Sequence, residues 1–216
     1  MRILCYGDSN TWGWVPSSMG TKRYSGRWPV VLQRLLGDKY TVIEEGLGGR
    51  TTSFDDPRSE FPERNGLKTL PIILETHLPL DLVIIMLGTT DTKEMLNLSS
   101  EKIAEGMSSL VKVTKKYRTL TGTSSPQILI IVPPIVKEDC EIASKLFKGG
   151  TLKGKKLVEL YERVAKEEGV LYLDPTTNIK VDDKEGIHID EQNHERLAKL
   201  IYEKIMTGEN SVSRRK

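Results

Sequence analysis

The sequence predicts an α/β protein, a three-layer α/β/α sandwich around a five-stranded parallel sheet. The first observation behind this prediction is a set of five short apolar runs that are rich in β-branched residues and nearly continuous rather than alternating. Such runs are typical of strands covered on both faces. The second observation is that helix-period stretches separate these runs, and strands that alternate with helices pair in parallel through right-handed crossovers. At 216 residues, the chain is long enough to bury the core of one such domain.

The predicted strands and helices alternate along the chain. The predicted strands are 3–6, 40–44, 81–87, 127–133 and 170–173. The predicted helices are 27–36, 65–76, 100–118, 151–168 and 191–206. Ser99 is a suitable N-cap for the third helix, and Gly169 is a suitable C′ residue for the fourth. Because we find no repeat or linker, residues 1–207 are predicted to form a single domain, and the polar, basic tail 208–216 is expected to be disordered.

Composition excludes several classes of partner. The chain has 32 Lys and Arg against 30 Asp and Glu, a net charge of +2, whereas binding to nucleic acid or an anionic membrane needs a basic excess on one face. The longest apolar runs, LVIIML and ILIIVPPIV, are too short to span a bilayer. The two cysteines, Cys5 and Cys140, have neither disulfide nor metal-ligand spacing. Without a recognisable export signal, a cytoplasmic protein with no bound metal is expected.

Ligands of such a sheet bind outside the carboxyl ends of the strands, so the five segments that follow the strands are the candidate site. They are GDSN (7–10), EGLGGRTT (45–52), GTTDTK (88–93), PPIVKEDC (133–140) and DPTTNIKVDDKEGIHID (174–190). All are rich in Gly, Pro, Thr, Asp or Ser, as loops generally are. Composition alone therefore assigns no function, and the question is whether these segments supply complementary chemistry.

A nucleophile and a base can be drawn from these segments. Ser9 follows the first strand, where it is either a nucleophile or an ordinary capping serine; the GxSxG motif of α/β-hydrolases is absent. Of the three histidines, His77 and His194 fall at or in helices and are expected to be structural. His188 lies in a loop after the last strand, with Glu185 three residues earlier, a spacing that lets the carboxylate accept from Nδ1–H and leaves Nε2 for Ser9.

The other segments offer groups that suit an oxyanion or a tight turn. Gly48 and Gly49 allow positive φ and a close approach of backbone N–H groups to a ligand. Hydroxyls and the carboxylate of Asp91 follow the third strand.

Taken together and in this order, these segments resemble the SGNH, or GDSL, hydrolase family. YGDSN resembles the family's first block, Gly49 matches its glycine, GTTD (88–91) stands where the family has Gly-x-Asn-Asp, and EGIH (185–188) stands where it has Asp-x-x-His. The stretches GDSNTWGW, VIEEGLGGRTT and THLPLDLVIIMLGTTDTK resemble most closely the bacterial arylesterase and acyltransferase branch. The resemblance runs nearly end to end, and it implies a flavodoxin-like fold.

The resemblance also implies an activity and roles. It implies a serine esterase or acyltransferase that acts on small, short-chain acyl or aryl esters through an acyl-enzyme on Ser9, with no cofactor, and that forms homo-oligomers. Ser9 N–H, Gly49 N–H and the residue at position 90 would form the oxyanion hole. Asp8, as a turn-fixing residue, and Asn10, Trp12 and Gly48 are expected around the substrate pocket. Trp12 and Trp14 are expected either as pocket or interface walls or as core aromatics.

Two positions depart from the family pattern. Thr90 replaces the oxyanion-hole asparagine with a shorter, β-branched side chain, and Glu185 replaces the aspartate with a longer one. These departures give the main alternative, a catalytically impaired protein that keeps the fold and binds a ligand. A third hypothesis, a phosphate-cradling nucleotide or flavin site at GDSNTWG, is disfavoured because that loop lacks the Gly-rich and Lys-Ser/Thr signatures of such sites.

Overall fold

A computed structural model describes residues 1–58, 60, 62–117 and 125–213 of the chain. Its centre is a sheet of five strands in the order β2-β1-β3-β4-β5, in which every neighbouring pair is parallel. The strands are β1 (Arg2–Gly7), β2 (Thr41–Gly46), β3 (Leu82–Met86), β4 (Gln127–Ile131) and β5 (Leu171–Leu173). This is the strand order of flavodoxin-like doubly wound sheets. The predicted fold class is therefore confirmed.

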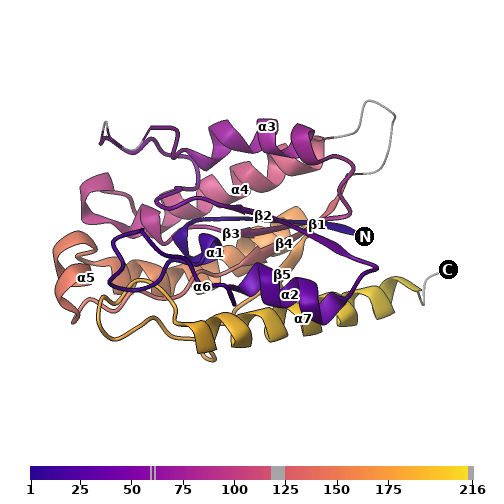
Figure 1. Cartoon of the computed structure of the whole chain (residues 1–216). Coiled ribbons are helices and arrows are strands. Elements are labelled where there is room, and N and C mark those ends of the chain that lie inside the picture. Colours follow the sequence, from indigo (N-terminus) through magenta and orange to yellow (C-terminus); the bar gives the residue numbers. More distant parts are fainter. Residues whose placement is uncertain (59, 61, 118–124, 214–216) are drawn as a thin grey trace.

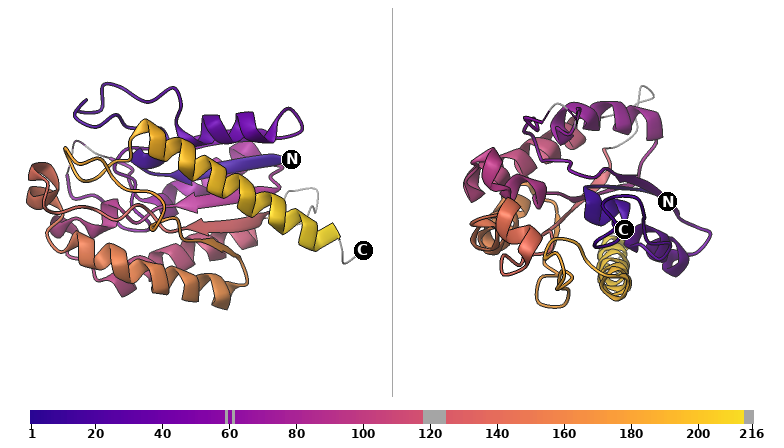
Figure 2. Two further views of the ribbon diagram at one scale, coloured as in Figure 1. Left: turned by 90° about the horizontal axis from the view of Figure 1, so that it is seen from below. Right: turned by 60° about the vertical axis from the view of Figure 1, so that its left-hand side comes forward.

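Helices cover both faces of the sheet (Figure 1). One face packs against α3 (Gly66–His77), α4 (Ser100–Lys116) and α6 (Gly150–Glu168). The other face packs against α2 (Trp28–Leu36) and α7 (Glu191–Ser213), which lie side by side in front of the strands in the left view of Figure 2. Along β1, Ile3 and Cys5 enter one core while Leu4 and Tyr6 enter the other. Burial on both sides explains why the strand sequences are continuously apolar.

The helix ends agree with their predicted caps. The Ser99 side chain accepts a hydrogen bond from the N–H of Lys102 at 3.3 Å at the start of α4. Gly169 ends α6 in the left-handed conformation, with a φ of 61°. Sequence patterns did not predict α1 (Ser9–Trp12), α5 (Glu141–Leu146) or the 3-10 helices η1 (Thr90–Thr92) and η2 (Glu94–Leu96), because elements this short show no helical period.

Residues 208–213 belong to the segment that the sequence predicts to be a disordered tail. The backbone there continues α7 to Ser213. The buried part of the helix, which includes Ile201 and Ile205, supplies the nucleus, and each further residue then adds one hydrogen bond at little cost. Residues 214–216 of the tail and residue 118, the predicted end of the third helix, lie outside the described residues.

The topology brings three strand exits together. β1 lies between β2 and β3 in the sheet. The helix that follows β1, α2, packs on one face, whereas α3 and α4, which follow β2 and β3, pack on the other, which makes this the switch point where doubly wound folds bind ligands. The loops after the strands gather at the left of Figure 1, at the opposite end of the sheet from residue 1. Ser9, Gly49 and Thr90 follow β1, β2 and β3 in turn. The sheet thus places all three at one edge.

Candidate active site

Ser9 is the first residue of α1, two residues after β1 ends. The side chain of Asp8, the N-cap, accepts a hydrogen bond from the N–H of Asn10 at 2.9 Å and so fixes the turn. The helix is pressed against the end of β2, since a Cβ atom at Gly46 would lie only 2.3 Å from the backbone nitrogen of Trp12. Only glycine permits this approach. Ser9 is therefore held rigidly at the sheet edge.

His188 and Glu185 meet Ser9 from the loop between β5 and α7. The Nε2 atom of His188 lies 2.8 Å from Ser9 Oγ, and Nδ1 contacts Glu185 Oε1. The other carboxylate oxygen of Glu185 accepts a hydrogen bond from the N–H of Ser17 at 3.1 Å. Burial alone would raise the pKa of Glu185, but the hydrogen bonds from His188 and Ser17 outweigh it and lower the pKa. The carboxylate is thus kept ionised, with Nδ1 as donor and Nε2 as acceptor of the Ser9 proton.

The other two histidines lie elsewhere. His77, at the end of α3, contacts Glu45 through Nε2 at 2.7 Å. His194, inside α7, accepts a hydrogen bond from the N–H of Trp28 at 3.3 Å, and burial lowers its pKa to about 3. Neither contacts Ser9 among the hydrogen bonds of the described residues. Both have the structural roles expected from the sequence.

Three hydrogen-bond donors belong to residues that line the cavity around Ser9. Within the described chain, neither the N–H of Ser9 nor that of Gly49 donates to another residue, and the hydroxyl of Thr90 has no hydrogen-bond partner. Gly49 has a φ of 80°, a conformation that favours glycine. Ser9, Gly49 and Thr90 line one cavity. Unpaired donors of this kind can bind an oxyanion.

Residues 5–196 match the model of the GDSL-like lipase/acylhydrolase family. The chain belongs to this family. No curated protein sequence matches the chain. Among solved structures, the aryl esterase of M. smegmatis is 40% identical, with a TM-score of 0.89 over 95% of this chain and 98% of that one. Est24, a carbohydrate acetylesterase from Sinorhizobium meliloti, is 38% identical, with a TM-score of 0.88 over 95% of this chain and 98% of that one. These findings confirm the family, and they make this GDSL-family chain a carboxylic ester hydrolase.

The cavity of this GDSL-family chain has a volume of about 590 Å³. Ser9, His188 and Glu185 lie in its wall together with Gly48. Half-buried Trp12 and Trp14 line it too, so both tryptophans take the first of the two roles that the sequence left open. The rest of the apolar wall is formed by Met19, Leu47, Ile142, Leu146, Phe147 and Ile187. The nucleophile therefore opens into a mainly apolar space that suits a small ester.

The loop that carries Gly49 is tied to the exit of β3. The backbone N–H and the hydroxyl of Thr52 both donate to the buried Asp91 carboxylate, at 2.9 Å and 2.6 Å. Burial raises the pKa of Asp91 to about 6, even though these hydrogen bonds oppose that rise. Asp91 follows Thr90 directly. The buried Thr52–Asp91 contact therefore connects the segment that follows Gly49 to the residue that follows Thr90.

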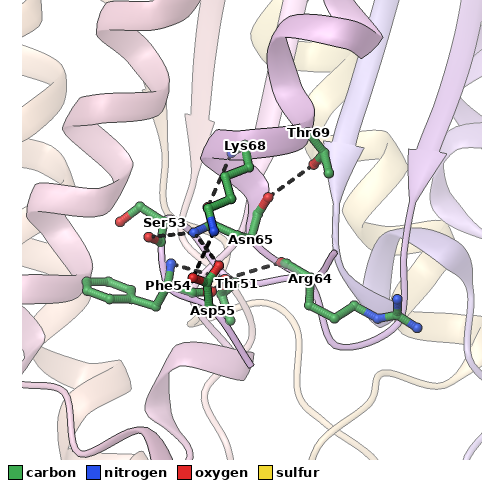
Figure 3. Close-up of polar contacts among 8 residues, drawn as sticks. All are labelled: Thr51, Ser53, Phe54, Asp55, Arg64, Asn65, Lys68 and Thr69. Atoms are coloured by element: carbon green, nitrogen blue, oxygen red, sulfur yellow. Dashed lines mark hydrogen bonds and ion pairs between the residues drawn. The ribbon is translucent and has the colours of Figure 1, made fainter. Parts of the chain in front are cut away.

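A second set of polar contacts supports the same loop where it enters α3 (Figure 3). Asn65 caps α3, and its Nδ2 donates to Ser53 O and to Asp55 Oδ1, each at 3.0 Å. The N–H of Thr51 donates to Arg64 O at 2.9 Å. In Figure 3 the Arg64 side chain extends away from this cluster; its Nε donates to the carbonyl of Gly48 at 2.8 Å. Both ends of the loop are thus anchored.

Two expected pocket residues lie elsewhere. Asp8 and Asn10 are buried and are not among the residues that line the cavity. Asp8 caps α1, as a turn-fixing residue would, and burial raises its pKa to about 6. Asn10 instead contacts the His188 loop: its Oδ1 accepts from the N–H of Ile189 at 3.0 Å, and its Nδ2 donates to the carbonyl of Ile187 at 3.4 Å. The structure thus places these two side chains in the support of α1 and of the His188 loop rather than among the residues that line the cavity.

Sequence reasoning missed several parts of the cavity wall, among them the following two. Leu146 and Phe147, at the end of α5, come from a segment with no pattern that predicts a pocket. Lys93 also lines the cavity, and it lies in the predicted exit segment 88–93, where only the hydroxyls and Asp91 were considered.

The described residues show neither a metal-binding cluster nor a membrane span. No group of three or more His, Cys, Asp or Glu side chains in that part of the chain is placed to hold a metal ion. No helix within the same residues combines the length and apolarity needed to cross a membrane. Cys5 and Cys140 are both free and buried.

Proposed function

We propose that the chain hydrolyses small acyl esters with Ser9 as nucleophile, His188 as general base and Glu185 as the group that orients His188. The observation that carries this proposal is the continuous contact from Ser9 Oγ to His188 Nε2 at 2.8 Å and from His188 Nδ1 to Glu185. Such a relay lets an imidazole remove the serine proton while a carboxylate stabilises the resulting imidazolium.

The proposed reaction has two halves. Ser9 Oγ attacks the ester carbonyl as its proton passes to His188 Nε2, and the N–H groups of Ser9 and Gly49 with the hydroxyl of Thr90 bind the oxyanion. The tetrahedral intermediate then collapses; His188 gives its proton to the leaving alcohol, and the acyl group stays on Ser9. Water, activated by His188, releases the acid in the second half, and an alcohol in place of water would give acyl transfer.

The cavity and the relatives both support small substrates. A space of about 590 Å³ with two tryptophans in its wall suits an aryl or short acyl group. The related structures are named as an aryl esterase and a carbohydrate acetylesterase. We therefore propose short-chain acyl esters, including aryl esters, as the substrate class. The family resemblance also supports a homo-oligomer, which sedimentation would test, and we retain the cytoplasmic location as a proposal.

The alternative, an impaired ligand-binding protein, is not favoured. It rested on Thr90 and Glu185 in place of the family's asparagine and aspartate. The extra methylene of Glu185 is accommodated, since its carboxylate contacts both His188 and the N–H of Ser17. Thr90 lines the cavity beside Ser9 and Gly49.

The test is labelling with a fluorophosphonate probe, followed by intact mass measurement and peptide mapping. One adduct on Ser9 is expected, and the S9A variant should neither form it nor hydrolyse p-nitrophenyl acetate. Ser109→Ala is the matched control, because Ser109 lies on α4 outside the cavity and bonds only its own helix. An adduct that persists in S9A would place the nucleophile elsewhere and refute the proposal.

A further inference from the structure

The cavity wall carries an excess of positive charge. In the described chain, its cationic residues are Arg58, Arg64 and Lys93, and its single carboxylate is that of Glu185. Glu185 is already engaged by His188 and by Ser17. An overall positive wall is unusual for a pocket meant only for neutral esters, because each buried charge costs solvation free energy.

The two arginines are held by the protein. Arg58 makes a two-pronged contact with Asp56, at 2.8 Å from Nε and 2.5 Å from one terminal nitrogen. Arg64 donates to the carbonyls of Gly48 and Pro62, at 2.8 Å and 2.7 Å. Both side chains thus make hydrogen bonds within residues 48–64, the segment that includes Gly49.

Lys93 differs from both arginines. Within the described chain, its ammonium has no hydrogen bond or ion pair, and its one recorded contact is the ring of Phe147, 6.0 Å from Nζ to the centroid. The side chain is half-buried in the cavity wall. Burial, and then repulsion from Arg58, lower its pKa to about 8. Lys93 is therefore a cation that makes no direct ion pair within the described chain, although the more distant Asp56, Asp8 and Asp91 favour its charged form.

The backbone of Lys93 is held next to Thr90. Its backbone N–H donates to the carbonyl of Thr90 at 3.1 Å, so it follows the proposed oxyanion donor by one short turn, η1. A substrate whose carbonyl oxygen lies at Thr90 would place another of its groups along the same wall.

We propose that Lys93 determines specificity by binding a carboxylate at the non-reacting end of an anionic ester substrate. The inference rests on the proposed ester hydrolysis and names the substrate class of that site. A carboxylate would accept a charge-assisted hydrogen bond from the ammonium, and the pair would be stronger in this half-buried place than in bulk water. Neutral esters would leave the ammonium unpaired.

The test uses matched esters that differ in charge. On the alcohol side the pair is para-acetoxybenzoate and para-acetoxybenzamide; on the acyl side it is the p-nitrophenyl monoester of glutaric acid and p-nitrophenyl pentanoate. In the natural protein, at least one anionic ester should exceed its neutral partner in kcat/KM by about tenfold, mainly through KM. In Lys93→Met that ratio should fall to about one, and in Lys93→Arg it should persist.

A control and a second readout separate this inference from the proposed function. Lys102→Met, an exposed lysine on α4 outside the cavity, should keep the ratio. Binding of para-hydroxybenzoate and para-hydroxybenzamide to the S9A variant, followed by tryptophan fluorescence from Trp12 and Trp14, needs no catalysis. Selective loss of benzoate binding on adding Lys93→Met would support the inference even if Ser9 were not the nucleophile. A charge preference that is absent in the natural protein, or that survives Lys93→Met in folded protein, would overturn it.

Discussion

The indole ring of Trp14 lies against the imidazole of His188, with ring centroids 5.0 Å apart and planes 17° from parallel. The backbone N–H of Trp14 donates to the backbone carbonyl of Ser9 at 3.0 Å, so the same segment that covers the base is bonded to the nucleophile. His188 is thus fixed in three ways, by Ser9 at Nε2, by Glu185 at Nδ1 and by the indole on one face. The stack excludes water from that face and limits rotation of the imidazole.

Replacing Trp14 should therefore lower turnover through His188. Stacked aromatic pairs contribute about 0.5–1.5 kcal/mol, which corresponds to a loss of roughly twofold to tenfold in kcat for Trp14→Ala. Trp14→Phe should recover most of the loss, because a phenyl ring can still stack on the imidazole. The measurement is steady-state kinetics on phenyl acetate over a range of pH. If the phenylalanine and alanine variants were equally slow, stacking would not be the cause.

Turnover should require the Glu185 carboxylate and should depend on the length of the side chain at this position. In Glu185→Gln the side chain can still accept from His188 but carries no charge to stabilise the imidazolium, so kcat should fall by about 10²–10⁴. Glu185→Asp shortens the side chain by about 1.5 Å, which withdraws the carboxylate from His188 and from the N–H of Ser17. It should also be slow, although aspartate is the residue of the family pattern. Full activity in Glu185→Asp would show that the loop, rather than side-chain length, sets this contact.

The sequence predicted the fold and the family more completely than it predicted the interior of the site. Continuous apolar strands and alternating helices predicted the sheet, which is confirmed, because burial on both faces leaves a strong pattern. Asn10 does not line the cavity with its neighbour Ser9, because successive helical residues point about 100° apart, and the sequence alone does not show which of the two faces the site. The wall formed by Phe147 depends on tertiary packing that leaves no local signal. The roles of Ser9, His188 and Glu185 stay predictions.

Asn10 should act as a positioning residue for His188. Its amide bridges the backbone on both sides of that histidine, at Ile187 and Ile189. Asn10→Ala would leave the buried N–H of Ile189 without its acceptor, at a cost of about 1–3 kcal/mol in the free energy of unfolding. The same variant should also lower kcat more than it changes KM, because His188 would no longer be held in hydrogen-bonding position against Ser9. Urea unfolding and kinetics measured together test this; Asn10→Asp, which keeps the acceptor, should be the less damaging variant. A stability loss with unchanged kcat would leave Asn10 a purely structural role.

Lys93 should lower the stability of the protein at neutral pH. The pKa of its ammonium falls from 10.5 to about 8 through burial and repulsion from Arg58, although Asp56, Asp8 and Asp91 oppose the shift. At pH 7 the group is charged in both the folded and unfolded chains, so the folded chain bears the full cost of burying it. Each pKa unit corresponds to about 1.4 kcal/mol, so Lys93→Met should be more stable by as much as ~3 kcal/mol.

This gain should depend on pH in a definite direction. Above pH 8 the folded protein loses the proton while the unfolded chain keeps it until about pH 10.5, so the natural protein gains stability as pH rises. The difference between the natural protein and Lys93→Met should therefore shrink between pH 7 and pH 10, as measured by urea unfolding. A variant that is less stable than the natural protein at pH 7 would mean that the ammonium has a stabilising partner.

Thr90 is the position at which a single change should raise activity. Its hydroxyl lines the cavity with Ser9 and Gly49 but projects less far than the amide nitrogen of an asparagine. One oxyanion donor contributes about 10²–10³ in turnover, so Thr90→Asn should raise kcat by up to ~10²-fold if the amide reaches the oxyanion. KM for a neutral ester should change little, because the donor acts mainly on charge that develops in the transition state. Thr90→Val, which keeps the shape without the hydroxyl, is the matched control and should lower kcat if Thr90 already donates. Steady-state kinetics on phenyl acetate compare the three proteins, and a kcat for Thr90→Asn at or below that of the natural protein would show that threonine is no handicap in this site.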